Sequence, residues 1–167
     1  MHSLGLNPKV KAVLNPAEGY PKMIAKERIS QGEIVEVSAS HDISLIQAGE
    51  LCNISKSFFH CIQPNPIKLK DANEKTDSLY KELVSEVLQK GNPDKEEIEK
   101  IKEDPRLIDL FHGLKWMDVI IGHIPYYLED PIPNCEIKWN EKSGLWQVVA
   151  LIEILPDETL TILQKAK

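Results

Sequence analysis

Residues 131–139 read PIPNCEIKW, a stiff turn that leads into a strand-like segment. Pro131 and Pro133 bracket Ile132, and each proline fixes its own φ and restricts the residue before it to extended geometry. The turn therefore has few conformations. A rigid turn that leads into a strand is typical of a segment that holds neighbouring residues in a fixed position. We take this stretch as the starting point for predicting the fold.

The segments that follow predict a β-hairpin. CEIKWN (135–140) and LWQVVALIEI (145–154) are rich in β-branched and aromatic residues, and they flank the polar loop EKSG (141–144). A short polar loop with glycine between two such runs is a hairpin signal. LPDETLTILQ (155–164) then indicates a turn and a short final strand.

The first part of the chain, residues 1–69, also reads as short strands between turns. KMIA (22–25) and GEIVEVSAS (32–40) predict strands separated by a turn at residues 30–32. DISLIQAGEL (42–51) could be a further strand broken at Gly49, and a helix is the alternative. Pro64-Asn65-Pro66 closes this part.

Residues 70–121 have a helical pattern. Leu79, Leu83 and Val87 form a row at i, i+4 spacing, which is typical of the apolar face of an amphipathic helix. Asn92 followed by Pro93 predicts one helix start, and Asp104-Pro105 predicts another that runs on through MDVII. We expect two or three helices. The 8 basic and 11 acidic residues between Lys70 and Arg106 are interpreted as their solvated faces.

Strands, a helical block and strands again predict an α+β fold with mostly antiparallel sheets. The 167 residues suffice for one domain, and no apolar run long enough to span a membrane is present. The N-terminus lacks the pattern of a secretion signal. The net charge of −6 disfavours direct nucleic-acid binding and permits a basic partner.

Three cysteines, Cys52, Cys61 and Cys135, are odd in number and contain no C-x2-C pair. This pattern disfavours both a disulfide framework and a structural zinc site, so we expect a reducing cytoplasm and no metal.

The order of these segments resembles the SET domain of protein lysine methyltransferases. Ala25-Lys26, Ile29 and Gly32-Glu33 match the family's first motif, and Pro133-Asn134 matches its later Pro-Asn. The family's last motif is matched by Ile154, Glu158, Leu160, Thr161 and Ile162. The resemblance covers residues 19–62 and 113–164. It implies one small, divergent bacterial-type SET-like domain over residues 1–167, with an N-terminal β part (1–69), a helical insertion (70–121) and a C-terminal β part (122–167).

The resemblance also implies that the segment ending in Pro133-Asn134 is threaded through a loop near the C-terminus, a pseudoknot that builds the cofactor and catalytic site. The cofactor would be S-adenosylmethionine. However, the family motif Asn-His-Ser-x-x-Pro-Asn is not retained, because Leu128, Glu129 and Asp130 occupy its first three places. Gly122-His123 offers a rival pair six residues upstream, but the ungapped alignment is preferred.

Two further departures concern the other parts of that site. The family's Gly-x-Gly loop is replaced by Tyr20, Pro21 and Lys22, where side chains would intrude on the ligand. The tyrosine after the last strand is replaced by Gln164, and no post-domain cysteine cluster follows.

By position, the residues that could bind the cofactor are Lys22, Met23, Glu129, Asp130 and Asn134. Tyr126 or Tyr127 could replace the missing tyrosine in catalysis, although such a pair is more typical of core packing with hydroxyls at the surface.

Other candidate sites are weaker. His41-Asp42 is interpreted as an exposed turn pair and His60-Cys61 as part of a buried strand. His112 and His123 could face the same way, but no third metal ligand is evident.

Two functions therefore remain open. The chain is either a SET-like protein that has lost catalysis and binds a partner, such as a basic or lysine-containing protein or peptide, or a methyltransferase with an atypical site. An unrelated α+β binding module is a distant third.

Overall fold

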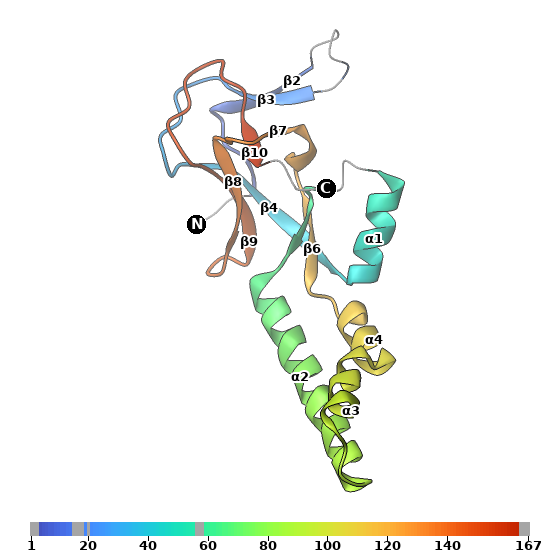
Figure 1. Ribbon diagram of the computed structural model, residues 1–167. Helices are drawn as coiled ribbons and strands as arrows, with labels where there is room; N and C mark the ends of the chain where they lie inside the picture. Colours follow the sequence, from blue (N-terminus) through green and yellow to red (C-terminus); the bar gives the residue numbers. More distant parts are fainter. Residues whose placement is uncertain (1–3, 15–18, 20, 56–58, 164–167) are drawn as a thin grey trace. The chain divides into compact units, whose positions relative to one another are not determined.

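The computed structural model describes residues 4–14, 19, 21–55 and 59–163 (Figure 1). The chain divides into two compact units. The first, here called the β unit, comprises Met1–His41, Ser57–Cys61 and Val119–Lys167. The second, here called the helical unit, comprises Asp42–Lys56 and Ile62–Asp118. Each unit is discontinuous in sequence. That the whole chain acts as one domain stays a prediction.

The β unit is built from short strands. Their bounds are β1 Gly5–Leu6, β2 Val10–Leu14, β3 Pro21–Ala25, β4 Ile34–Ile43, β6 Met117–Ile121, β7 Leu128–Asp130, β8 Cys135–Asn140, β9 Leu145–Ala150 and β10 Thr161–Leu163. The part of the main sheet that these strands form has the order β6-β4-β9-β8, and β1 pairs with β4. β2 and β3 form an antiparallel pair, and β7 and β10 form a parallel pair. This mixture of small, mostly antiparallel sheets confirms the predicted α+β class.

The predicted hairpin is β8 and β9. Its register pairs Cys135 with Ala150 and Asn140 with Leu145, and the loop between them closes at Gly144, whose φ of 67° suits glycine. Trp139 and Trp146 face each other across the strands with ring centroids 5.5 Å apart. The hairpin therefore contributes one wall of the core.

The core of the β unit gathers side chains from nearly all of its strands. Their apolar side chains are removed from water, which is the main favourable term in folding. The residues with no more than 2% exposure include Met23, Ala25, Ile29, Val35, Ile124, Tyr127, Cys135, Val148, Ile154, Leu160 and Ile162.

The C-terminal segment is fastened to β3 by backbone hydrogen bonds. Leu160 N donates to Met23 O (2.9 Å), Asp157 N donates to Ala25 O (2.7 Å), and Ala25 N donates to Glu158 O (3.0 Å). Residues far apart in sequence are thus held side by side (Figure 1). This pairing positions the candidate site.

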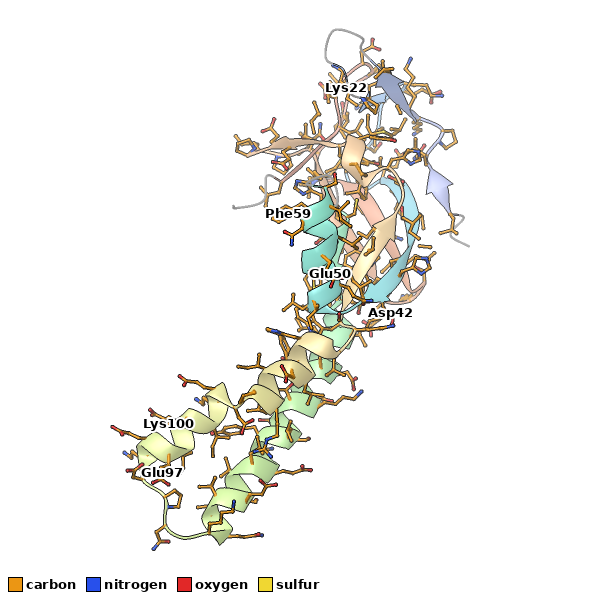
Figure 2. The ribbon with its side chains drawn as sticks, turned by 90° about the vertical axis from the view of Figure 1, so that its right-hand side faces the viewer. Lys22, Asp42, Glu50, Phe59, Glu97 and Lys100 are labelled. Atoms are coloured by element: carbon orange, nitrogen blue, oxygen red, sulfur yellow. The ribbon has the colours of Figure 1, made fainter. Side chains whose placement is uncertain are left out.

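The helical unit contains α1 (Leu45–Ile54), β5 (Ile62–Pro64), α2 (Pro66–Gln89), α3 (Lys95–Lys100), the short 3₁₀ helix η2 (Ile101–Glu103) and α4 (Pro105–Gly113). In Figure 2, the labelled side chains of Glu97 and Lys100 project from α3. The unit's fully buried apolar cluster is small. It consists of Leu83, Ile101 and Leu107, with Leu79, Tyr80, Val84 and Val87 partly buried against it.

Side-chain caps start the helices. Ser44 and Gln47 form a capping box at α1, and Asn65 Oδ1 accepts from the backbone N–H groups of Ile67 and Lys68 at the start of α2. Asp104 caps α4, with Pro105 in the first turn, as predicted. Asn65 also donates to Asp118, which is fully buried and receives the Lys68 ammonium at 2.7 Å.

Two expectations about local structure are corrected, and one open alternative is decided. Residues 45–54 are a helix, the alternative given for this stretch, because the capping box at Ser44 ends the strand. The predicted continuation of helix through MDVII is wrong, because 117–121 is strand β6. The cap of α3 is Asp94 rather than Asn92, since Asp94 Oδ1 accepts from Glu97 N at 2.9 Å.

Candidate functional site

Asn134 is held by the C-terminal segment through both its backbone and its side chain. Its Nδ2 donates to Thr159 O (2.9 Å), and its Oδ1 accepts from Thr161 N (2.8 Å). Its backbone N–H donates to Thr161 Oγ1 (3.0 Å), and its carbonyl accepts from Leu151 N (2.8 Å). We call this set of bonds the Asn134 clasp. The clasp brings the PIPN turn against residues 151–161, a proximity that the predicted thread requires.

β7 lies beside β10 in parallel register, with Leu128 opposite Thr161 and Asp130 opposite Leu163. Its two acidic side chains are both engaged. Asp130 Oδ1 accepts from Ile132 N at 2.8 Å, and the Glu129 carboxylate pairs with Nε2 of the largely buried His60. His60 is thus part of a polar pair in the β unit, a role that its sequence neighbours do not predict.

Glu36 on β4 is a buried carboxylate with 2% exposure, and it accepts several hydrogen bonds. Its Oε2 accepts from the backbone N (2.9 Å) and Nδ1 (2.8 Å) of His123, and its Oε1 accepts from Tyr127 Oη (2.9 Å). Ser38 Oγ lies 3.4 Å from Oε2. We call these residues the Glu36 cluster. Its donors satisfy a charge that would otherwise be expensive to bury.

Gly122 fits closely against this cluster. A Cβ atom on Gly122 would lie 2.5 Å from Ser38 Oγ and 2.6 Å from Glu36 Oε2. Cβ atoms essentially never come so close to other atoms, so any larger residue here would force the Ser38 and Glu36 side chains to shift. Gly122-His123, the rival motif pair in the sequence, therefore serves the Glu36 cluster.

The two candidate tyrosines have different environments. Tyr127 is buried at 2% exposure, and its hydroxyl binds Glu36, so the expectation of a surface hydroxyl is wrong for this residue. Burial, together with the nearby Glu36 charge, raises the pKa of Tyr127 well above its ordinary value. Tyr126 on the short 3₁₀ helix η3 (Ile124–Tyr126) is 37% exposed, and its ring lies 6.1 Å from that of His123.

The predicted N-terminal cofactor residues lie on β3. Met23 is fully buried in the core and its carbonyl accepts from Leu160 N, so its side chain is part of the packing. Lys22 is half-buried on the same strand. Gln164, the place of the family's tyrosine, and Tyr20 lie outside the described residues.

The structure therefore brings several predicted residues to one place. Met23 and Asn134 bind the same C-terminal segment, and Glu129 and Asp130 lie on the strand that pairs with its end. Sequence reasoning missed Glu36 and the role of His60. The signal that could have found Glu36 was its position between Val35 and Val37 in a predicted strand.

Within the described ranges, no group of three His, Cys, Asp or Glu side chains is arranged to hold a metal ion. Over the same residues, no helix has the length and apolar character needed to cross a membrane.

No protein-family model and no curated protein matches the sequence. The structure, however, is similar to solved SET-domain structures. A protein described as a candidate histone methyltransferase from Plasmodium falciparum matches with a TM-score of 0.51 and 12% identity, over 97% of each chain. The Neurospora SET domain protein DIM-5, a histone lysine methyltransferase, matches with a TM-score of 0.55 and 14% identity over 98% of this chain. This chain covers 54% of that structure. The predicted SET-like fold is confirmed.

Proposed function

We propose that this chain is a SET-like domain that no longer transfers methyl groups and acts by binding a partner protein. The observation that carries the proposal is the state of β7. Its residues stand at the places of the family's Asn-His-Ser, its backbone pairs with β10, and Glu129 and Asp130 already accept hydrogen bonds from within the chain. Leu128, at the place of the family's asparagine, has no polar side-chain group.

If S-adenosylmethionine bound at β7 through Glu129 and Asp130, these carboxylates would have to give up the hydrogen bonds that they accept within the chain. Opening the pair between Glu129 and His60 would remove a charge-assisted hydrogen bond from a largely buried imidazole. The loss of a partner at such a group costs about 1–3 kcal/mol. A carboxylate here would also repel the carboxylate of S-adenosylmethionine.

The environment of Tyr127 supports the same conclusion. Methyl transfer depends mainly on holding the amine, the methyl group and the sulfur in line. If Tyr127 were to orient an amine, its hydroxyl would have to leave Glu36, and the buried carboxylate would lose one of its donors. The hydrogen bond therefore favours a structural role for Tyr127.

A basic or lysine-containing protein or peptide is the partner class that the net charge of −6 favours. A reducing cytoplasm is the proposed compartment, because no disulfide joins Cys52, Cys61 and Cys135, and two of these cysteines are buried.

The second candidate is a lysine methyltransferase with an atypical site. It is favoured by the Asn134 clasp, which keeps the Pro-Asn pair against the C-terminal segment. In such an enzyme, Glu129, Asp130 and Asn134 would hold S-adenosylmethionine, and Tyr126 would be the tyrosine with accessible surface.

Thermal unfolding with and without millimolar S-adenosylmethionine, followed by calorimetric titration, separates the two candidates. A ligand at about 100 times its Kd stabilises a protein by roughly 2.7 kcal/mol, which raises Tm by about 5–10 °C at this size. We expect no shift and no titration heat. Incubation with basic peptides and the cofactor should leave the peptide mass unchanged. A cofactor-dependent shift or a methylated peptide would overturn the loss of methyl transfer.

A further inference from the structure

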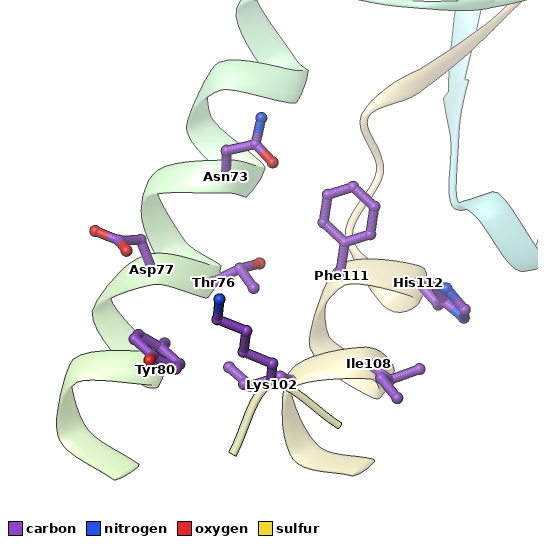
Figure 3. A pocket seen from close by; sticks show the side chains of 9 residues that line it. Asn73, Thr76, Asp77, Tyr80, Lys102, Ile108, Phe111 and His112 are labelled. Carbon is purple, nitrogen blue, oxygen red and sulfur yellow. The ribbon is translucent and has the colours of Figure 1, made fainter. Parts of the chain in front are cut away.

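A hollow of about 470 Å³ lies between α2 and α4 of the helical unit (Figure 3). Along α2 it is lined by Asn73, Thr76, Asp77 and Tyr80, whose spacing of i, i+3, i+4 and i+7 places them on one face. At 1.5 Å per residue, this row is about 10 Å long, or two helical turns. We call this hollow the α2–α4 groove.

The opposite wall of the groove is apolar. Leu107 is buried at its floor, Phe111 is half-buried, and Ile108 at its rim is 43% exposed. The Phe111 ring is backed by Trp116, with centroids 4.9 Å apart, so it forms a firm surface. The groove thus presents apolar side chains to solvent beside the small core of the helical unit.

Lys102, which is exposed, also lines this groove of mixed polar and apolar side chains. Figure 3 shows Lys102 with its ammonium end pointing into the hollow between the two helices. Among the residues that the structure describes, no carboxylate lies within salt-bridge distance of its Nζ. Asp77 at the rim is already paired with Lys81 at 3.2 Å. A partner with a carboxylate opposite the exposed Lys102 would gain an electrostatic match that a partner without one would lack.

From these contacts we infer that the α2–α4 groove binds an amphipathic helix of a partner protein, whose apolar face carries one carboxylate opposite Lys102. Two flanking helices with an apolar floor form the shape that a third helix fills, with anchors at i, i+3 or i+4, and i+7. The inference rests on the proposed binding function. To the basic partner named there it adds a surface and one acidic side chain on the helix that docks at this groove.

The test uses the full chain and a displayed library of helical peptides of about 14 residues, four turns, with the positions of one face randomised. We expect enrichment of peptides with apolar residues at helical spacing and Asp or Glu at one central position. Fluorescence anisotropy with a purified enriched peptide should show binding that Lys102→Glu weakens by about tenfold or more. When the acidic residue of this peptide is replaced by Lys, the peptide should bind the Lys102→Glu variant more tightly than it binds the original protein.

Two further variants control this experiment. Lys100→Glu makes the same charge change on an exposed residue that does not line the groove, and it should leave the affinity unchanged. Ile108→Asp should abolish binding, and its circular dichroism and Tm should match those of the original protein because Ile108 is exposed.

Several outcomes would overturn the inference: no enrichment, enriched helices without an acidic residue, or equal binding to the Lys102→Glu variant. Light scattering that shows a dimer broken by Ile108→Asp would assign the groove to a second copy instead. These results are separate from those with S-adenosylmethionine. A cofactor-dependent Tm shift would contradict the loss of methyl transfer, whereas a failed selection without such a shift would contradict the groove alone.

Discussion

The hydroxyl of Tyr127 donates a 2.9 Å hydrogen bond to Oε1 of Glu36, although 91 residues separate them in sequence. Both residues have 2% exposure, so this bond is made without competition from water. It links β4 to the segment before β7, and it converts a tyrosine that the sequence offers as a catalytic candidate into part of the core.

Tyr127→Phe should lower the free energy of unfolding by about 1–3 kcal/mol, because the Glu36 carboxylate loses a buried donor. Urea unfolding followed by tryptophan fluorescence measures the change. Tyr126→Phe is the matched control, since Tyr126 is 37% exposed and its change should stay within about 0.5 kcal/mol. Equal effects of the two variants would contradict the structural role assigned to Tyr127.

Asn134→Ala should destabilise the β unit by about 2–4 kcal/mol, because the side chain makes hydrogen bonds to both Thr159 and Thr161. Hydrogen exchange should show the Thr161 amide losing protection while the amides of the β8–β9 hairpin keep theirs. Asn92→Ala, an exposed asparagine that caps no helix, should leave both measurements unchanged. If Thr161 kept its protection in Asn134→Ala, the clasp would not hold the segment.

Gly122→Ala should cost about 1–3 kcal/mol, since its Cβ would meet Ser38 and Glu36 at 2.5 and 2.6 Å. Gly49→Ala in α1 has nothing within 4 Å and should stabilise the protein by up to about 1 kcal/mol through helix propensity. Opposite signs in denaturant titrations of the two variants are the expected result. A stabilising Gly122→Ala would show that the Glu36 cluster is not packed against this glycine.

Stability at high pH should depend on Cys135. Burial raises the pKa of this thiol from 9.0 to about 12, so the unfolded chain releases the proton first as pH rises. The thiol's contribution to the free energy of unfolding is therefore complete below pH 9. It declines toward pH 12, by at most about 1.4 kcal/mol per pH unit. The raised pKa of Tyr127 likewise makes stability fall as pH rises above the ordinary pKa of tyrosine.

Cys135→Ala tests this dependence, because alanine cannot titrate. Urea midpoints at pH 8, 9 and 10, which span the ordinary pKa of the thiol, should fall less steeply with pH in the variant than in the original protein. In the same pH range, iodoacetamide should label Cys135 more slowly than the half-buried Cys52, and denaturant should remove the difference. Identical pH slopes would show that the thiol ionises equally in both states.

Local signals predicted much of the fold. The hairpin of 135–150 and the start of α4 at Asp104-Pro105 follow from a glycine loop and a helix cap, which act within a few residues. Strand β6 was not predicted, because MDVII is a short apolar run whose pattern fits either a buried strand or a helix end. The sequence of residues 45–54 was ambiguous for the same reason. The structure shows that the Ser44 capping box starts a helix there.

The candidate site could be predicted from the sequence only for residues that occupy positions of a family motif. Asn134, Glu129 and Asp130 were selected by their order relative to Pro133, and all three lie at or beside the C-terminal segment. The Glu36 cluster depends on partners 87 and 91 residues away, and no local pattern specifies such hydrogen bonds. The pairing of His60 with Glu129 spans 69 residues and was missed for the same reason.

The strand pairs on either side of the Asn134 clasp differ in the sequence separation of their partners. The β8–β9 hairpin pairs residues that lie between 5 positions (Asn140 and Leu145) and 15 positions (Cys135 and Ala150) apart, whereas β10 pairs in parallel with a strand more than thirty residues earlier. Contacts between distant parts of a chain form slowly, because loop-closure entropy must be overcome first. We therefore expect the hairpin to form early and the parallel pair of β7 and β10 to be completed late. On this expectation, β10 pairs with β7 only after the turn that receives it has taken shape.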